Sequence, residues 1–136
     1  MNAQKYTKKS LEAVQAAQEL AVSQNHQQIE QVHLLLALLR QDGGLIPQLL
    51  TKMGVSVESL DAAATAELHK LPSVTGAGRE AGKYYIARSV DSVFTQAESL
   101  AESMGDDFVS VEHLLLALCE QADATVRRLF DTYRIT

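Results

Sequence analysis

Two histidines occupy the same place in two copies of a short sequence, and they are the first candidates for chemistry. His33 and His113 each begin the hexapeptide His-Leu-Leu-Leu-Ala-Leu, at an offset of 80 residues. Two histidines could bind a metal ion or transfer protons. Neither has a second ligand four residues further along its helix, as a helical metal motif requires. We therefore expect both to be structural elements at the start of a buried helix.

The single cysteine, Cys119, is a second candidate, as a nucleophile activated by His113. The two residues are six positions apart on one predicted helix, which places them on different faces. Cys119 stands where the first copy has Leu39. Free cysteine usually packs as a small apolar residue, so we expect Cys119 to be a buried core residue.

The remaining ionisable residues lie near the ends of predicted helices. Asp106 and Asp107 follow Gly105 in a loop, where charge is normally solvated. His26 and His69 are expected to be solvated for the same reason. The glycine-rich stretch 72–82 lacks the Gly-Lys-Ser/Thr ending of a phosphate-binding loop and reads as a linker. The sequence therefore predicts no catalytic residue, no metal site and no cofactor in this domain.

Composition narrows the class of protein further. The chain has 136 residues, 46% of them hydrophobic but only 5% aromatic, which favours closely packed helices rich in Leu and Ala. A net charge of −5 and a pI near 5.3 argue against nucleic acid as a partner. One cysteine fits a reducing compartment. The longest apolar run, Leu34–Leu39, is too short to cross a membrane, so the expected location is cytoplasmic.

Apolar spacing of three and four residues predicts the helices that position these side chains. Gly54 and Gly105 are expected to end two of them in the left-handed conformation. The predicted helices cover residues 7–24, 32–40, 46–53, 57–71, 86–104, 111–120 and 125–133.

The duplication extends beyond the hexapeptide. Residues 10–56 align with 90–136, with identities or apolar matches along the whole window. We predict a single all-α domain, 1–136, built from a pseudo-two-fold duplicated four-helix motif. Repeat 1 has its core at 10–56 and its fourth helix at 57–71; a linker at 72–82 leads to repeat 2 at 83–136. Because Thr136 aligns with Ser56, we expect the second copy to lack its last helix in this chain. Either this repeat is naturally shorter or, as we expect, the chain is a fragment of a longer polypeptide. A duplicated motif also predicts a seam between its halves, where such proteins often bind ligands.

The pattern of a helix, a polar turn and His-Leu-Leu-Leu-Ala-Leu, then Leu-Leu-x-x-x-Gly-Val, resembles the double Clp-N motif. The copies are joined by Leu71-Pro72-x-Val74-x-Gly76-x-Gly78. The motif forms the N-terminal domain of Clp/Hsp100 AAA+ unfoldases, and Gly105-Asp106-Asp107-Phe108 is most similar to the ClpB disaggregase branch. The resemblance implies an eight-helix domain that engages unfolded or aggregated polypeptides for a hexameric ATPase ring. ATP and magnesium would belong to the full-length protein, which would cooperate with an Hsp70 system.

The resemblance also implies site residues. Thr7, Asp106 and Glu112 match polar positions that border the substrate groove in the ClpB branch. The ClpC branch has a glutamate before the histidine in each copy. Here the second copy has Glu112 but the first has Val32, which argues against ClpC-type recognition of adaptors and phosphorylated arginine.

The candidate apolar rim of the groove includes Leu11 and Phe108, which join the polar residues as predicted polypeptide-binding residues. The other rim candidates are Leu45, Ile46, Leu49 and Val109. Leu49, repeated as Leu129, is expected in the core. Thr7 and Asp106 could equally be caps or loop residues, and Glu112 a first-turn acid favoured by the helix dipole.

Two other functions remain open at this point. The domain could dock a folded adaptor protein rather than exposed client segments. It could also be a free-standing double-motif protein without an ATPase ring. In each case we expect the isolated domain to be monomeric, with no nucleic-acid or membrane partner.

Overall fold

The computed structural model describes residues 1–74 and 85–135, and this part of the chain is mostly helical, so the all-α prediction is confirmed. A short 3-10 helix, η1 (Ala3–Lys5), comes first. The α-helices are α1 (Lys8–Ser23), α2 (Gln31–Leu39), α3 (Leu45–Lys52), α4 (Val57–Leu68), α5 (Arg88–Ser103), α6 (Val111–Glu120) and α7 (Ala124–Tyr133). Two strands of two residues each, β1 (Gln28–Ile29) and β2 (Tyr85–Ile86), were not predicted.

The helix ends follow the expected turn chemistry, with two corrections. Helix α4 ends at Leu68 rather than at 71, and Ile86 belongs to β2 rather than to α5. Gly54 and Gly105 have φ values of 84° and 73°, as predicted for left-handed caps. At the position equivalent to Gly54, repeat 2 has Arg134 in the same conformation, with φ 58°.

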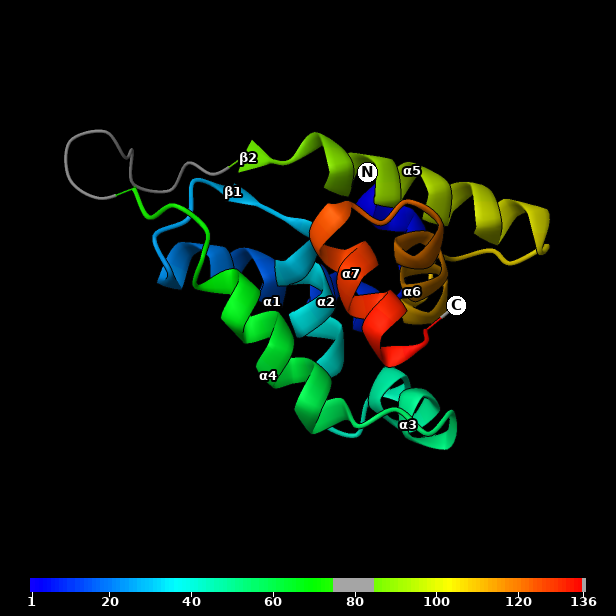
Figure 1. Cartoon of the computed structure of the whole chain (residues 1–136). Helices are drawn as coiled ribbons and strands as arrows, with labels where there is room; N and C mark the ends of the chain where they lie inside the picture. Colours follow the sequence, from blue (N-terminus) through cyan, green and yellow to red (C-terminus); the bar gives the residue numbers. More distant parts are fainter. Residues whose placement is uncertain (75–84, 136) are drawn as a thin grey trace.

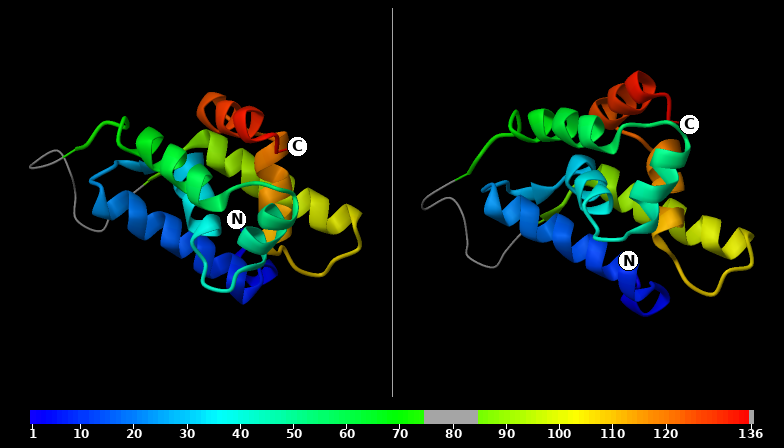
Figure 2. Two further views of the ribbon diagram at one scale, coloured as in Figure 1. Left: turned by 60° about the horizontal axis from the view of Figure 1, so that its bottom comes forward. Right: turned by 90° about the horizontal axis from the view of Figure 1, so that it is seen from below.

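The helices form three layers, with the two leucine-rich helices in the middle (Figures 1 and 2). Helices α1 and α5 lie on one side of α2 and α6, and α4 and α7 lie on the other. Every residue of α2 is buried. On α1 the buried positions toward α2 are Ala13, Ala17 and Ala21, whose small side chains let the two helices approach closely.

The two repeats exchange short extended segments across the seam. The residues before α5 pair in parallel with β1, so that Ile86 is opposite Ile29. The residues before α1 make the equivalent bridge in the other direction, with Tyr6 opposite Val109. Tyr6 and Ile86 are 80 residues apart, and so are Ile29 and Val109. The two pairings are therefore related by the pseudo-two-fold symmetry of the duplication.

The pseudo-symmetry is incomplete because the described residues contain no counterpart of α4 in repeat 2. Helix α4 packs against α2 and α7 through Leu60, Ala64 and Leu68. Leu36 on α2 is fully buried, whereas its equivalent on α6, Leu116, is 40% exposed. The absence of that covering helix gives the repeats different surfaces.

The predicted linker, 72–82, lies mostly outside the described residues. Its first part is held to repeat 1, since the Val74 amide donates to the Asn25 carbonyl at 2.7 Å. None of the helices in residues 1–74 and 85–135 combines the length and apolarity needed to span a membrane.

Candidate functional site: a groove at the seam between the repeats

A groove opens where the first turns of α1 and α6 meet the turn between α2 and α3. Its volume is about 510 Å³, and most of the surface lining it is apolar. Leu45 and Val111 supply apolar side chains, and Thr7 and Glu112 lie at its edge with the lysines of the first turn of α1. The residues that line it are Thr7, Lys8, Lys9, Gln41, Gly43, Gly44, Leu45, Ser110, Val111 and Glu112.

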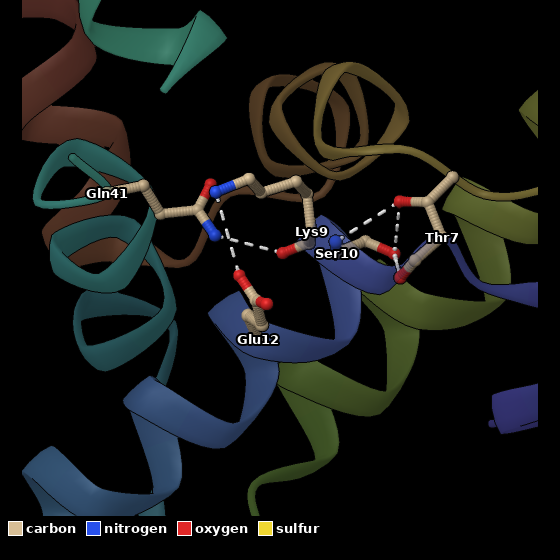
Figure 3. Close-up of polar contacts among 5 residues, drawn as sticks. All are labelled: Thr7, Lys9, Ser10, Glu12 and Gln41. Carbon is tan, nitrogen blue, oxygen red and sulfur yellow. Dashed lines mark hydrogen bonds and ion pairs between the residues drawn. The ribbon is translucent and has the colours of Figure 1, made fainter. Parts of the chain in front are cut away.

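Hydrogen bonds from both repeats fix Thr7 at the start of α1, and Figure 3 shows those with Ser10. Its hydroxyl accepts the Ser10 amide at 3.1 Å, which caps the helix, and its own amide donates to the Val109 carbonyl at 2.9 Å. Ser10 is fully buried and donates its hydroxyl to that same carbonyl at 2.9 Å. Thr7 is therefore a cap and an anchor between the repeats, with part of its side chain left exposed to the groove.

On the side of the groove opposite Thr7, a hydrogen bond joins the turn between α2 and α3 to α1. The Gln41 side-chain amide donates to the Lys9 carbonyl at 2.9 Å (Figure 3). Lys9 and Glu12 form an exposed ion pair at 3.7 Å, which contributes little to stability. The groove therefore has walls fixed by backbone contacts and charged groups that remain in water.

The structure brings together only part of the predicted site. Thr7 and Glu112 line the groove, but Asp106, Phe108 and Leu11 do not. Asp106 borders a separate hollow, between Lys5 and α5. Phe108 is exposed, and Leu11 is half-buried against the core.

The candidate rim residues separate in the same way. Leu45 lines the groove, whereas Ile46 and Val109 are core residues with almost no exposed surface. The expectation that Leu49 lies in the core is wrong: it is 37% exposed, although its equivalent Leu129 is buried. Helix α4 packs against α7, and the described residues contain no counterpart of α4 in repeat 2 that could pack against α3 in the same way.

The two repeated histidines are structural, as the sequence predicted, and the structure shows them to be helix caps. The Nδ1 of His33 accepts the Glu30 amide at 2.8 Å, and the Nδ1 of His113 accepts the Ser110 amide at 2.9 Å. In each copy the residue before the helix and the histidine form a reciprocal capping box. This need for an acceptor in the first turn explains why both copies have histidine.

Ser110, His113 and Asp106 form a hydrogen-bonded chain that has the composition of a catalytic triad. The Ser110 hydroxyl lies 3.0 Å from Nδ1 of His113, and Nε2 lies 2.9 Å from the Asp106 carboxylate. The Ser110 amide engages the same Nδ1, so its one lone pair is already used by the backbone. In repeat 1 the same cap forms with Glu30 in place of Ser110, which makes helix capping the simpler explanation.

Repeat 1 replaces that aspartate with a histidine, and the expectation of a solvated His26 is wrong. His26 is only 4% exposed, and its Nδ1 lies 2.8 Å from Nε2 of His33. Nδ1 of His33 accepts a hydrogen bond from the Glu30 amide, so the neutral ring has its proton on Nε2 and donates it in the hydrogen bond to His26. Burial, followed by the neighbouring His26, lowers the pKa of His33 to about 4.

Cys119 is half-buried against the core, and burial raises the pKa of its thiol, so it is a poor nucleophile. Across residues 1–74 and 85–135 no three His, Cys, Asp or Glu side chains gather as metal ligands would. The groove thus offers apolar surface, a hydroxyl and charges, which suit binding rather than bond breaking.

The comparison with known proteins identifies the class. The family model for the Clp repeat (R) N-terminal domain matches residues 5–133, and the chain therefore belongs to the Clp N-terminal domain family. Chaperone protein ClpB of Bacillus cereus (strain ATCC 14579) is 42% identical over 136 residues, all of this chain but 16% of that relative. ClpB of Clostridium tetani is 36% identical over 135 residues, 99% of this chain and 16% of that relative.

Solved structures share the fold. The Hsp104 N-terminal domain from Candida albicans has a TM-score of 0.78 at 22% identity, covering 97% of this chain and 83% of that chain. A complex of the ClpV N-domain with a VipB peptide has a TM-score of 0.71 at 15% identity, covering 96% of this chain and 79% of that one. These similarities confirm the fold.

Proposed function

We propose that this domain holds exposed apolar segments of unfolded or aggregated polypeptides in the groove at the seam between the repeats. The observation that carries the proposal is a groove of about 510 Å³, mostly apolar, bounded by Leu45, Val111, Thr7 and Glu112. An extended segment can place apolar side chains against Leu45 and Val111. Its backbone and polar groups would meet the Thr7 hydroxyl and the Glu112 carboxylate at the edge.

The expected affinity is low. Burying one large apolar side chain gains roughly 1.5–3 kcal/mol, and an open groove of this size takes two or three of them. Association costs at least about 4 kcal/mol in lost freedom of motion. The difference corresponds to dissociation constants on the order of 0.1–1 mM or weaker, which suits a receptor that must release its client.

The relatives suggest how such weak binding would become useful. They are ClpB chaperones about six times longer than this chain, and a ClpV N-domain has been solved with a VipB peptide. In our proposal the full-length protein is a hexameric AAA+ ATPase that uses ATP and magnesium and works in the cytoplasm with an Hsp70 system. Six N-terminal domains on one ring would raise the local concentration of sites and offset the weak single-site affinity.

Titration of the isolated domain with a fluorescent, permanently unfolded model protein tests the proposal. Leu45→Ser should weaken binding at least threefold, because it removes apolar surface from the groove. Val22→Ser is the matched control: Val22 is 42% exposed, close to the 44% of Leu45, but lies on α1 outside the groove. Equal affinity of both variants would refute the groove as the binding site.

The polar edge has its own matched pair. Glu112 and Glu58 are both exposed acids in the first turn of a helix, on α6 and α4. Glu112→Gln should weaken binding of basic unfolded segments, whereas Glu58→Gln should leave it unchanged. The adaptor-docking alternative predicts a different result, in which the domain retains folded partner proteins but does not bind the unfolded protein.

A further inference from the structure

The pseudo-symmetry places a second seam opposite the groove. The groove lies where the first residue of α6, Val111, meets the start of α1 and the α2–α3 turn. Moving each position by 80 residues leads to the first residue of α2, Gln31, the start of α5 and the α6–α7 turn. The second seam is therefore built from the same backbone elements as the groove.

Gln31 fills the second seam. Its side chain has no exposed surface, and its amide nitrogen donates to the Ser89 carbonyl at 3.0 Å and to the Gln121 carbonyl at 2.8 Å. Its side-chain oxygen accepts the Asp123 amide at 2.8 Å. One side chain thus links α2, α5 and the α6–α7 turn, which belong to both repeats.

The groove has no equivalent bridge because Val111 occupies the position of Gln31 and has no hydrogen-bonding group. The Lys9 carbonyl, equivalent to that of Ser89, receives the Gln41 side chain from the neighbouring turn instead. That contact joins the α2–α3 turn to α1. It does not involve α6, and Val111 makes no side-chain hydrogen bond to either of them. The difference between Gln31 and Val111 therefore decides which of the two seams is bridged by a side chain from its central helix.

We propose that Gln31 closes the second of two pseudo-equivalent seams and so limits the domain to one polypeptide-binding groove. This inference rests on the proposed function, since it concerns the number of sites for the same kind of ligand. Gln31 acts as a specificity-determining residue by occupying the space and saturating the backbone groups that a bound segment would use.

The second seam, once opened, would have a different polar edge. Val32 stands where the groove has Glu112, and Ala87 stands where it has Thr7. Arg88, in the first turn of α5, is the counterpart of Lys8. Glu30, however, stands where the groove has Ser110, and Asp123 where it has Gly43. An opened seam would therefore carry two acids and should take neutral or basic apolar segments.

Residue-resolved NMR titration of the domain with a soluble peptide of alternating leucine and serine provides the test. In the wild type, the amide signals of Gly43 and Gly44 should shift on binding, and those of Asp123 and Ala124 should not. In Gln31→Val both sets should shift. A folded Gln31→Val protein that shifts only the Gly43 and Gly44 signals would overturn the inference.

The reciprocal variant keeps the test decisive if Gln31→Val fails to fold. Val111→Gln should bridge the open groove and weaken the peptide affinity at least tenfold, with the remaining spectrum intact. A folded Val111→Gln protein with affinity within twofold of the wild type would also overturn the inference. Absence of any shift at Gly43 and Gly44 in the wild type would instead refute the proposed function, so the two failures are distinguishable.

Discussion

Mild acid should destabilise repeat 1 through His33. The imidazole has no exposed surface, and both of its nitrogens are engaged, by the Glu30 amide and by His26. A second proton would have to enter a ring whose Nδ1 already accepts a backbone N–H. Burial and the adjacent His26 lower the pKa of His33 to about 4 in the folded protein.

The direction of the effect follows from linkage. In the unfolded chain the pKa of His33 returns to about 6.5, so below that pH the unfolded state binds a proton that the folded state does not. The contribution to stability is complete above the unfolded pKa and is lost as the pH falls toward the folded pKa. The difference between pKa values of 6.5 and about 4 corresponds to about 3 kcal/mol in total. Of this, about 2 kcal/mol should be lost between about pH 8 and about pH 5.

Urea unfolding at a series of pH values measures this loss. His33→Asn should lower the stability at neutral pH but flatten the pH dependence, because an asparagine oxygen can accept the Glu30 amide and cannot titrate. His69→Asn is the control, since it makes the same replacement at an exposed histidine outside the cap. Equal losses between about pH 8 and about pH 5 in the wild type and in His33→Asn would refute the reasoning.

Three further changes test the contacts that hold the repeats together. Gln31→Ala should lower the free energy of unfolding by about 2–4 kcal/mol, because it leaves three backbone groups at the seam without their hydrogen bonds. Gln41→Ala loses one exposed hydrogen bond and should cost less than about 1 kcal/mol. Thermal and urea unfolding of the two variants compare these losses. Tyr6→Phe should cost about 1–2 kcal/mol in urea unfolding, since it removes the 2.7 Å hydrogen bond to the Glu98 carboxylate, and no loss would show that this bond is energetically neutral. Arg134→Gly should stabilise the fold by about 0.5–1 kcal/mol by relieving a left-handed conformation, and a lower melting temperature would contradict that assignment.

The helices were predictable because their apolar spacing and their caps are local properties of the sequence. The glycines after α3 and α5 have the left-handed conformation that the pattern indicated. The strands β1 and β2 were missed because two residues give no periodicity, and their pairing depends on the exchange of segments between the repeats.

Side-chain environments were harder to predict where they depend on a distant element. His26 lies in a polar stretch, and only the cap at His33 explains its burial. Leu49 repeats as Leu129, so identity suggested the core, but Leu49 is exposed and Leu129 is buried, because the described residues hold no counterpart of α4 in repeat 2. The alignment of the two repeats did indicate that the seams differ, since Gln31 and Val111 are the first residues of otherwise equivalent buried helices.

A crystal structure of this domain with a bound leucine-rich peptide tests the central claim most directly. Our account predicts an extended peptide at the seam, with an apolar side chain against Leu45 and Val111 and its polar groups near Thr7 and Glu112. A peptide bound instead along the charged hollow between α1 and α2, or on the exposed face of Leu49 and Leu116, would contradict it.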